Sequence, residues 1–341
     1  MTSLLSAISG NFSRSLVLGT FFPVALFVLL GVLLVVPLLP GDVVALQPLA
    51  ELDKEWKTVA VTGTALLLTG LLYNLNIPVI RFYEGYPWRQ SWVGRWRTAV
   101  HVRRMKRAEL LRPALRRLAQ AVRAGDPGDA RIAEWNAFQS DLGRTLKAEY
   151  PIHAAEVLPT RLGNVVRSFE EYPRWQYGIS AIPLWPRLVA VIDKEYAAMV
   201  EDAKSSLDFM LNCSLLSGLL AATLLFAGLL APGRVHLAEW LVQVAVLGSA
   251  AYVFYTGSVA RAHAWGAQVR GAFDLYRGDL MVKLGYGWKP ATPAEERELW
   301  RKISMQMVFG DPPAGLGTPL AYGPPQPAAS PAHPATAAAT T

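Results

Sequence analysis

The chain has 341 residues, of which 52% are hydrophobic and 17% are charged, and its formal net charge is +7. Ordinary soluble domains contain roughly 25% charged residues, so this composition indicates a membrane protein. The single cysteine, Cys213, excludes an intramolecular disulfide.

Four apolar runs are each close to the roughly 20 residues that a helix needs to cross a bilayer. They cover residues 16–39, 59–80, 207–230 and 240–260. A cleaved signal peptide is the alternative for the first run, because Val43, Val44 and Ala45 resemble a cleavage site. The run exceeds the about 7–15 residues of a signal-peptide core, which favours a retained span. We therefore predict four transmembrane helices.

Lysine and arginine beside the spans predict the orientation. The connection at 40–58 carries Lys54 and Lys57 among four acidic residues, whereas arginines follow the second and fourth runs. The prediction is a multi-pass protein with both termini in the cytoplasm. Residues 1–80 then form a transmembrane hairpin, and residues 81–185 form a helical cytoplasmic insertion.

Positive charge is concentrated at 81–123, where twelve Arg or Lys residues and two acidic residues give a net of +10. Tryptophans recur there every four residues, and a leucine stripe of helical spacing follows. This pattern is typical of a basic amphipathic helix that lies on anionic lipid headgroups. A plain topology determinant and a nucleic-acid partner are the alternatives, but direct continuity with a span favours lipid. The candidate headgroup contacts are Trp88, Trp92, Arg95, Trp96, Arg97, Arg103, Arg104, Arg112, Arg116 and Arg117.

Helical patterns separated by turn residues follow the basic segment. A turn signal at 126–129 and Pro151 bound a predicted helix at 132–150. The stretch RLGNVVRSFEEYPRWQYG (161–178) has apolar residues at i, i+3, i+4 and i+7, which predicts a short amphipathic helix that ends at Pro173. The residues expected on its other side are Arg161, Asn164, Ser168 and Glu171. The aromatic stretch 172–185 is expected to form a packed loop.

The C-terminal half predicts long helices. No proline occurs between Pro186 and Pro232, and a helical stripe continues into the third span, so we expect one helix over 186–230. A similar stripe continues after the fourth span, so 186–284 is predicted to be a long helical hairpin that extends below the membrane. Thr292, Pro293 and Glu295 predict a capped helix within 285–309. The tail, 310–341, has eight prolines in 32 residues and is predicted to be disordered. The fold class is all-α.

Motifs for metal binding, phosphate loops and nucleophilic catalysis are absent from the sequence, so no metal, cofactor or catalytic residue is predicted. Glu170 and Glu171 diverge by about 100° on a helix and do not form an acid–base dyad. With Arg161 and Asn164 they make a candidate structural polar cluster.

The spans hold uncharged polar residues, of which Tyr73, Asn74, Asn76 and Asn212 form a candidate intramembrane polar cluster. Interhelical hydrogen bonding is the structural interpretation of such residues. The segment from Asn74 to Pro78 is the expected break in the second span, because proline leaves a backbone carbonyl without its donor.

Five segments occur in the order LNIPVIRFYEGYPW (75–88), RLGN (161–164), WPRL (185–188), FDLYR (273–277) and EERELW (295–300). Together they resemble a group of multi-pass bacterial membrane proteins of no established function. The resemblance covers most of the chain except the tail. It implies a location in the bacterial inner (cytoplasmic) membrane, and it implies no activity, ligand or site residue.

These patterns predict a non-enzymatic integral membrane protein that acts as a scaffold, sensor or partner-binding platform. Its partners would be anionic lipids and either a second copy of the chain or a cytoplasmic protein. One alternative is an oligomeric channel or facilitator for a small solute. The other is a membrane-bound enzyme that acts on lipid, which requires Arg161, Asn164, His153 or a glutamate to converge in one cavity.

Overall fold

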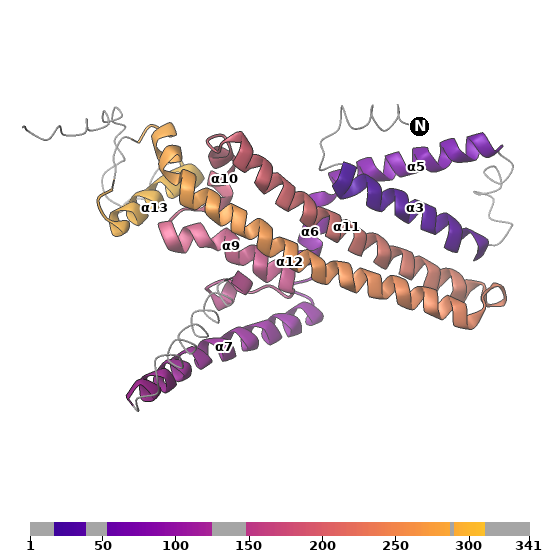
Figure 1. The fold of residues 1–341 in the computed structure, drawn as a ribbon, viewed down its shortest axis with the longest axis horizontal. Coiled ribbons are helices and arrows are strands. Elements are labelled where there is room, and N and C mark those ends of the chain that lie inside the picture. Colours follow the sequence, from indigo (N-terminus) through magenta and orange to yellow (C-terminus); the bar gives the residue numbers. More distant parts are fainter. Residues whose placement is uncertain (1–16, 39–52, 125–147, 287–289, 311–341) are drawn as a thin grey trace, which may run out of the picture. The chain divides into compact units, whose positions relative to one another are not determined.

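The structure is a computed structural model that describes residues 17–38, 53–124, 148–286 and 290–310. Within these ranges all regular elements are helices and no strand occurs, as the sequence predicts (Figure 1). The elements are η1 (Val17–Phe21), α3 (Phe22–Leu34), η2 (Val36–Leu38), α5 (Lys54–Asn74), α6 (Asn76–Glu84), α7 (Trp92–Ala124), η3 (Ala154–Glu156), α9 (Arg161–Tyr177), α10 (Ala181–Val189), α11 (Lys194–Leu230), η4 (Pro232–Arg234), α12 (Leu237–Lys283) and α13 (Pro293–Phe309). Except for residues 148–150 and 310, the predicted helix at 132–150 and the predicted disordered tail lie outside the described residues.

The helices belong to two compact units. The first unit comprises residues 1–169 and 198–268, and the second comprises residues 170–197 and 269–341. Helices α9, α11 and α12 each contribute residues to both units.

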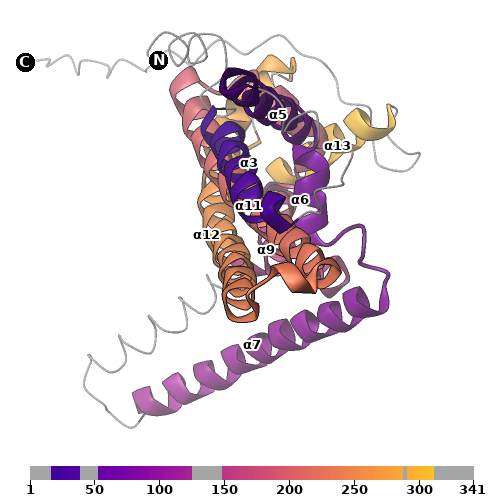
Figure 2. The same cartoon turned by 90° about the vertical axis from the view of Figure 1, so that its right-hand side faces the viewer.

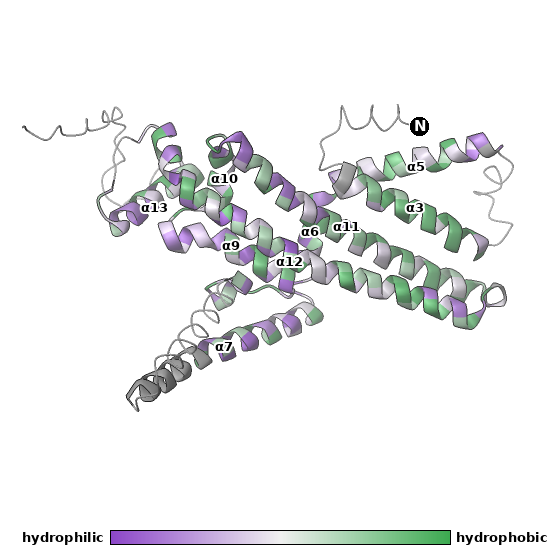
Figure 3. Cartoon of the chain, in the orientation of Figure 1, coloured by the Kyte–Doolittle hydropathy of each residue, from purple (hydrophilic) through white to green (hydrophobic). Residues whose placement is uncertain are grey.

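Three helical segments are long and apolar enough to cross a membrane: Gly19–Leu38, Lys194–Leu230 and Leu237–Lys283. Apolar residues cover α3 and large parts of α11 and α12 (Figure 3). A fourth candidate is the pair Glu55–Asn74 and Asn76–Glu84, whose two helices are bent by 59° relative to each other. These features suggest a membrane protein.

The bend between α5 and α6 lies at the predicted break. Pro78 is in the first turn of α6 and has no N–H for the carbonyl of Asn74, so the helix ends there and a new one begins. The side-chain Nδ2 of Asn74 donates to the carbonyl of Gly70 at 2.8 Å. Proline chemistry therefore accounts for the division of the second apolar run.

In the first unit, α11 and α12 run antiparallel and lie side by side (Figures 1 and 2). Ser214 Oγ of α11 donates to the carbonyl of Ala251 at 2.8 Å, and Trp240 Nε1 of α12 donates to the carbonyl of Leu224 at 2.9 Å. Gly228 faces the Trp240 indole so closely that a methyl group there would lie 2.2 Å from Nε1. A small residue thus permits close packing of the two helices.

Apolar side chains join α3 to the other apolar helices of the first unit. One cluster contains Val24, Val28, Ala65, Leu72 and Leu216, from α3, α5 and α11. Another contains Val35, Leu220, Leu224, Trp240 and Leu247. The first apolar run is therefore packed against the later ones.

The prediction of one helix from Pro186 to Leu230 is wrong. The chain forms α10 over Ala181–Val189, and α11 begins only at Lys194. The Asp193 carboxylate accepts a hydrogen bond from the backbone N–H of Tyr196 at 2.7 Å, which caps the first turn of α11. The apolar stripe did not reveal this break, because an aspartate cap leaves the spacing of apolar residues intact.

Pro173 does not end α9, which continues to Tyr177, and 172–185 is largely helical instead of a loop. Tyr172 and Tyr177 hydrogen-bond to the same side chain, that of Asp274, so the residues on both sides of the proline share one anchor. The helix ends at Gly178, whose φ is +80° and whose Cα faces the carbonyl of Arg297. Only glycine adopts this conformation at little cost.

The predicted C-terminal helix is present as α13. The Thr292 hydroxyl accepts from the backbone N–H of Glu295 at 3.2 Å, and the Glu295 carboxylate accepts from the N–H of Ala291 at 2.9 Å. Leu299, Trp300 and Ile303 form its buried face, as their spacing predicts.

Candidate functional site

The start of α9 is joined to the end of α6 through Thr160. Its hydroxyl donates to the carbonyl of Glu84 at 3.0 Å and accepts from the backbone N–H of Gly163 at 2.9 Å, so Thr160 caps α9. A methyl group on Gly163 would lie 2.3 Å from the carbonyl oxygen of Glu84. Gly163 therefore allows the backbones of α6 and α9 to approach closely.

Asn164 fixes the chain that leads into α9. Its side chain is 1% exposed, its Oδ1 accepts from the N–H of Leu158 at 2.7 Å, and its Nδ2 donates to the carbonyls of Leu158 and Thr160 at 2.9 and 2.8 Å. Both amide hydrogens are thus used by backbone acceptors. The role of Asn164 is structural, because its donors have no capacity left for a ligand.

The helix predicted in residues 161–178 is present as α9, and it is buried on more than one side, including most of its expected polar side. Asn164, Ser168 and Glu171 are all buried, and only Arg161 of the expected polar side is exposed. Ser168 Oγ donates to the carbonyl of Ala148 at 2.8 Å. Because short polar side chains bond to backbone here, polarity in the sequence does not imply contact with solvent.

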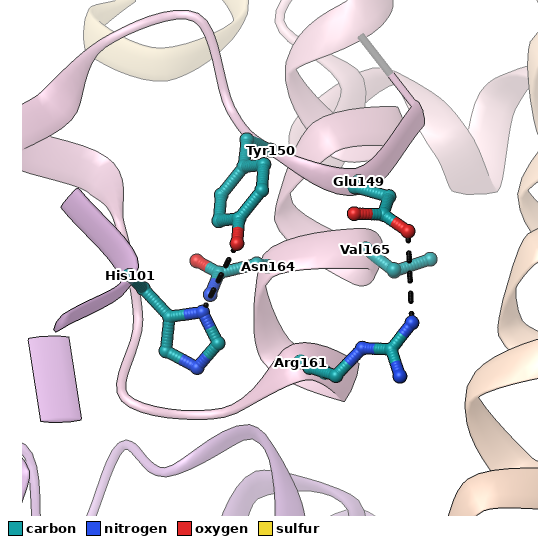
Figure 4. A pocket seen from close by; sticks show the side chains of 6 residues that line it. All are labelled: His101, Glu149, Tyr150, Arg161, Asn164 and Val165. Atoms are coloured by element: carbon teal, nitrogen blue, oxygen red, sulfur yellow. Dashed lines mark hydrogen bonds and ion pairs between the residues drawn. The ribbon is translucent and has the colours of Figure 1, made fainter. Parts of the chain in front are cut away.

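A small hollow lies beside the start of α9 (Figure 4). Its lining residues are His101, Glu149, Tyr150, Arg161, Asn164 and Val165, and its volume is about 10 Å³. A cavity of this size holds about one water molecule. The hollow combines an imidazole, a phenol and a carboxylate–guanidinium pair, so we take it as the candidate site.

His101 supplies the buried end of the hollow. It is 3% exposed, and its Nδ1 lies 3.2 Å from the Tyr150 hydroxyl. Burial first, and then the charges of Arg97, Arg104 and Arg161, lower the pKa of His101 to about 4. Burial, followed by the charge of Glu149, raises the pKa of Tyr150. At neutral pH both rings are therefore uncharged.

The outer side of the hollow is formed by an ion pair. Arg161 Nη2 lies 3.6 Å from Glu149 Oε1, and the two side chains are 54% and 34% exposed. The distance is too long for a direct hydrogen bond. Exposed pairs of this kind contribute about 0–1 kcal/mol, so the pair is weak.

Helix α7 has two distinct faces. Gly94, His101 and Met105 are spaced by seven and four residues and are all buried. Trp92 and Trp96 lie on the opposite side and are 76% and 59% exposed. The Ser91 hydroxyl caps the helix by accepting from the N–H of Gly94 at 3.1 Å.

The structure divides the candidate headgroup contacts into groups. Trp92, Arg95, Trp96 and Arg103 are exposed on the side of α7 away from the hollow, whereas Arg97 and Arg104 are near enough to act electrostatically on His101. Arg97 Nε also donates to the carbonyl of Pro159 at 3.1 Å, and Trp88 Nε1 donates to the carbonyl of Phe82 at 3.0 Å. The side chains of Arg112, Arg116 and Arg117 lie outside the described residues.

The candidate intramembrane polar residues are not brought into one cluster in the described contacts. Asn212 is buried and its Nδ2 donates to the carbonyl of Gly19 at 2.8 Å, whereas Asn74 bonds within its own helix. Tyr73 is exposed and Asn76 is half-buried. The amide of Asn212 thus donates to the backbone of another helix, whereas the amide of Asn74 donates to the backbone of α5 itself.

The candidate cluster around residues 161–171 is also divided. Arg161 and Asn164 line the hollow, whereas Glu170 and Glu171 belong to the second unit. His153 is exposed and is not among the residues that line the hollow. Sequence reasoning missed His101, Glu149 and Tyr150. The available signal was the position of His101 seven residues after Gly94 and four before Met105, on one side of α7.

The second unit contains another polar network that the sequence did not single out. The hydroxyls of Tyr172 and Tyr177 donate to Asp274 Oδ1 at 2.9 and 2.7 Å. Arg277 stacks over the Tyr177 ring at 4.2 Å, and its Nε donates to Glu296 at 2.7 Å. Burial and the bond to Asp274 raise the pKa of both tyrosines. The network ties α9, α12 and α13 together within this unit.

Comparison of the chain with protein-family models, curated proteins and solved structures finds no match. Among the described residues, no group of three or more His, Cys, Asp or Glu side chains is placed to hold a metal ion.

Proposed function

We propose that this chain is a four-span protein of the bacterial inner membrane and serves as a non-enzymatic scaffold or partner-binding platform. The bent pair of α5 and α6 is the second span, and both termini are cytoplasmic. The packing of α3 against α5 and α11 supports a retained first span. The arginines that follow α6 and the fourth apolar run support this orientation.

Helix α7 is the surface of the platform that lies on the inner leaflet. The observation that supports this contact is the exposure of Trp92 and Trp96, together with Arg95 and Arg103, on the outward side of α7. Exposed tryptophans among arginines suit the boundary between headgroups and acyl chains, where the indole is half-buried and the guanidinium meets phosphate. The opposite side of α7 is already packed inside the first unit, so this side is available to lipid.

Helices α11 and α12 extend beyond their apolar runs as the stalk of this platform. Support comes from the second unit, where the rings of Tyr196 in α11 and Tyr276 in α12 lie 5.4 Å apart. The Tyr276 hydroxyl also donates to Asp193. Paired contacts at the ends of two antiparallel helices are those that a helical hairpin requires.

The two alternatives receive less support. A polar path for a solute would use Asn74 and Asn212, but each has its amide bonded to a backbone carbonyl. Arg161 and Asn164 are two of the residues required for an enzyme that acts on lipid, and the hollow that they line holds about one water. The scaffold is therefore the function that the geometry favours.

The contact of α7 with lipid is tested with the full chain in vesicles of phosphatidylcholine with or without phosphatidylglycerol. A fluorophore on Trp96→Cys, in a Cys213→Ala background, is expected to be quenched by brominated lipids more strongly in the anionic vesicles. Replacing Arg95 and Arg103 with glutamine should weaken that quenching. The matched control carries the fluorophore at exposed Gln176. Equal quenching at both positions would contradict the proposed contact of α7 with the membrane surface.

The orientation is tested by single cysteines and a membrane-impermeant reagent. A cysteine at Lys54 is expected to react from outside intact cells, whereas cysteines at Arg104 and Glu298 should react only after the membrane is opened. The opposite pattern would reverse the topology.

The platform itself is tested by native mass spectrometry of the detergent-purified protein. We expect a second copy of the chain, a cytoplasmic protein or anionic lipid to remain bound. A monomer without protein or lipid would overturn the proposal.

A further inference from the structure

We propose that the hollow beside α9 binds a phosphate group, which the Arg161 guanidinium and the Tyr150 hydroxyl hold in place of the Glu149 carboxylate. The inference rests on the proposed function and deepens it by naming the group that is recognised. The phosphate has two possible sources, a lipid headgroup and free inorganic phosphate.

The hollow already has an anion at its outer side. The Glu149 carboxylate is 3.6 Å from Arg161 Nη2, close enough for attraction and too far for a hydrogen bond. Both side chains are partly exposed, so rotating Glu149 into solvent loses only a weak ion pair. A phosphate oxygen can then bond directly to the guanidinium, which matches phosphate geometry with two parallel donors.

The charge around the hollow favours an anion. Arg97 and Arg104 of α7 and Arg161 of α9 act on the buried imidazole of His101, and Glu149 is the carboxylate that lines the hollow. Arg97 is held in place by its bond to the carbonyl of Pro159. Three guanidinium groups against one carboxylate leave an excess of positive charge, which concentrates anions.

The donors at the hollow are those that phosphate requires. The Tyr150 hydroxyl and the neutral imidazole of His101 have one polar hydrogen each, and their mutual contact at 3.2 Å uses one of the two. When His101 Nδ1–H donates to the Tyr150 oxygen, the Tyr150 hydroxyl hydrogen is free to donate to a phosphate oxygen. Asn164 contributes no free donor and forms the wall. Because the hollow itself has room for about one water, the phosphate must occupy the present position of the Glu149 carboxylate.

The hollow also lies close to the proposed membrane boundary. Thr160, four residues before Asn164, is bonded to the carbonyl of Glu84, the last residue of α6. In the proposed topology α6 is the cytoplasmic end of the second span. The hollow is therefore within reach of a headgroup phosphate at the membrane surface on which α7 is proposed to lie.

His101 provides a direct readout in the full chain. In detergent, with labelled histidine and His101→Gln for assignment, inorganic phosphate is expected to raise the pKa of His101 from about 4 by roughly one unit or more, because a nearby anion stabilises the imidazolium. Chloride at matched ionic strength controls for screening. An unchanged titration in phosphate and in the lipid experiment would overturn the proposal.

Two matched variants separate this site from general attraction to the basic helix. Arg161→Gln should abolish the phosphate-induced shift, whereas Arg103→Gln, on the other side of α7, should retain it. Glu149→Gln removes the competing anion and should tighten phosphate binding by roughly two- to fivefold, the equivalent of an exposed ion pair. If Arg161→Gln does not fold, the tighter phosphate binding expected of Glu149→Gln still tests the site. A shift that persists in folded Arg161→Gln would overturn the site.

A lipid experiment distinguishes the sources. Nanodiscs of phosphatidylcholine with phosphatidic acid, compared with phosphatidylcholine alone, should reproduce the His101 shift if a headgroup enters the hollow. A shift with inorganic phosphate only would support the site as one for free phosphate. Quenching at Trp96 without any His101 shift would overturn this inference and leave the proposed function intact, and the reverse result would overturn only the lipid contact of α7.

Discussion

The side-chain amide of Asn164 pairs with the backbone of Leu158 in both directions: Oδ1 accepts from the Leu158 N–H at 2.7 Å, and Nδ2 donates to the Leu158 carbonyl at 2.9 Å. This reciprocal pair is buried. It satisfies backbone groups of a loop that has no regular partner of its own. Asn164 therefore replaces the hydrogen bonds that a strand or helix would have supplied.

Asn164→Ala is expected to lower the free energy of unfolding by about 2–4 kcal/mol, because it leaves buried backbone groups without partners. The measurement is the Tm of the detergent-solubilised full chain by circular dichroism. Gln176→Ala, at an exposed position of the same helix, is the control and should change stability by less than about 0.5 kcal/mol. Equal Tm values for the two variants would show that the hydrogen bonds between Asn164 and Leu158 are dispensable for stability.

Gly163→Ala should destabilise the protein through steric overlap. The new methyl would lie 2.3 Å from the Glu84 carbonyl oxygen and 2.9 Å from Thr160 Oγ1. These two atoms are held in place by the hydrogen bond that joins them. We expect a loss of about 1–3 kcal/mol, the range for overpacking. Gly278→Ala is the matched control, since nothing lies within 4 Å of its Cβ position, and it should be neutral or stabilising by up to about 1 kcal/mol. Thermal unfolding of both variants provides the comparison, and a harmless Gly163→Ala would contradict the close approach.

His101 should make stability depend on pH in the acid range. Its pKa is lowered from 6.5 to about 4 in the folded protein. Between these values the unfolded chain binds a proton that the folded chain does not, so stability falls as pH decreases from 6.5 to about 4. His101→Gln should flatten this part of the Tm–pH curve, and exposed His153→Gln should leave it unchanged. Identical acid limbs for the wild type and His101→Gln would refute the assignment.

The sequence predicted features that depend on local chemistry. Thr292 and Glu295 cap a helix because capping needs only the neighbouring backbone, and Pro78 interrupts a helix because it lacks an N–H. Such effects act within a few residues and can therefore be read from the order of the chain.

Features that depend on distant partners were not predicted. Pro173 stays within a helix because Tyr172 and Tyr177 share Asp274, about one hundred residues away in the chain. Asn164 and Ser168 fall opposite the apolar side by spacing, yet they are buried and bond to the backbone of preceding segments. His101 meets Tyr150 across 49 positions. Periodicity describes one helix and contains no information on what covers its polar side.

Because Tyr172 and Tyr177 both donate to the Asp274 carboxylate, we expect the stability of the fold to decline at alkaline pH. Burial and the bond to Asp274 raise the pKa of Tyr172 well above the ordinary value of 10.0. The unfolded chain loses its phenolic proton near pH 10 while the folded chain keeps it, so stability is complete below pH 10 and is lost as pH rises above it. Tyr172→Phe should lower stability by about 1–2 kcal/mol at pH 8, the contribution of a hydrogen bond to a charged acceptor, and should make the alkaline decline less steep. Tm values from pH 8 to about 11, with exposed Tyr252→Phe as the control, measure both effects, and an alkaline limb as steep as that of the wild type would exclude Tyr172 as its source.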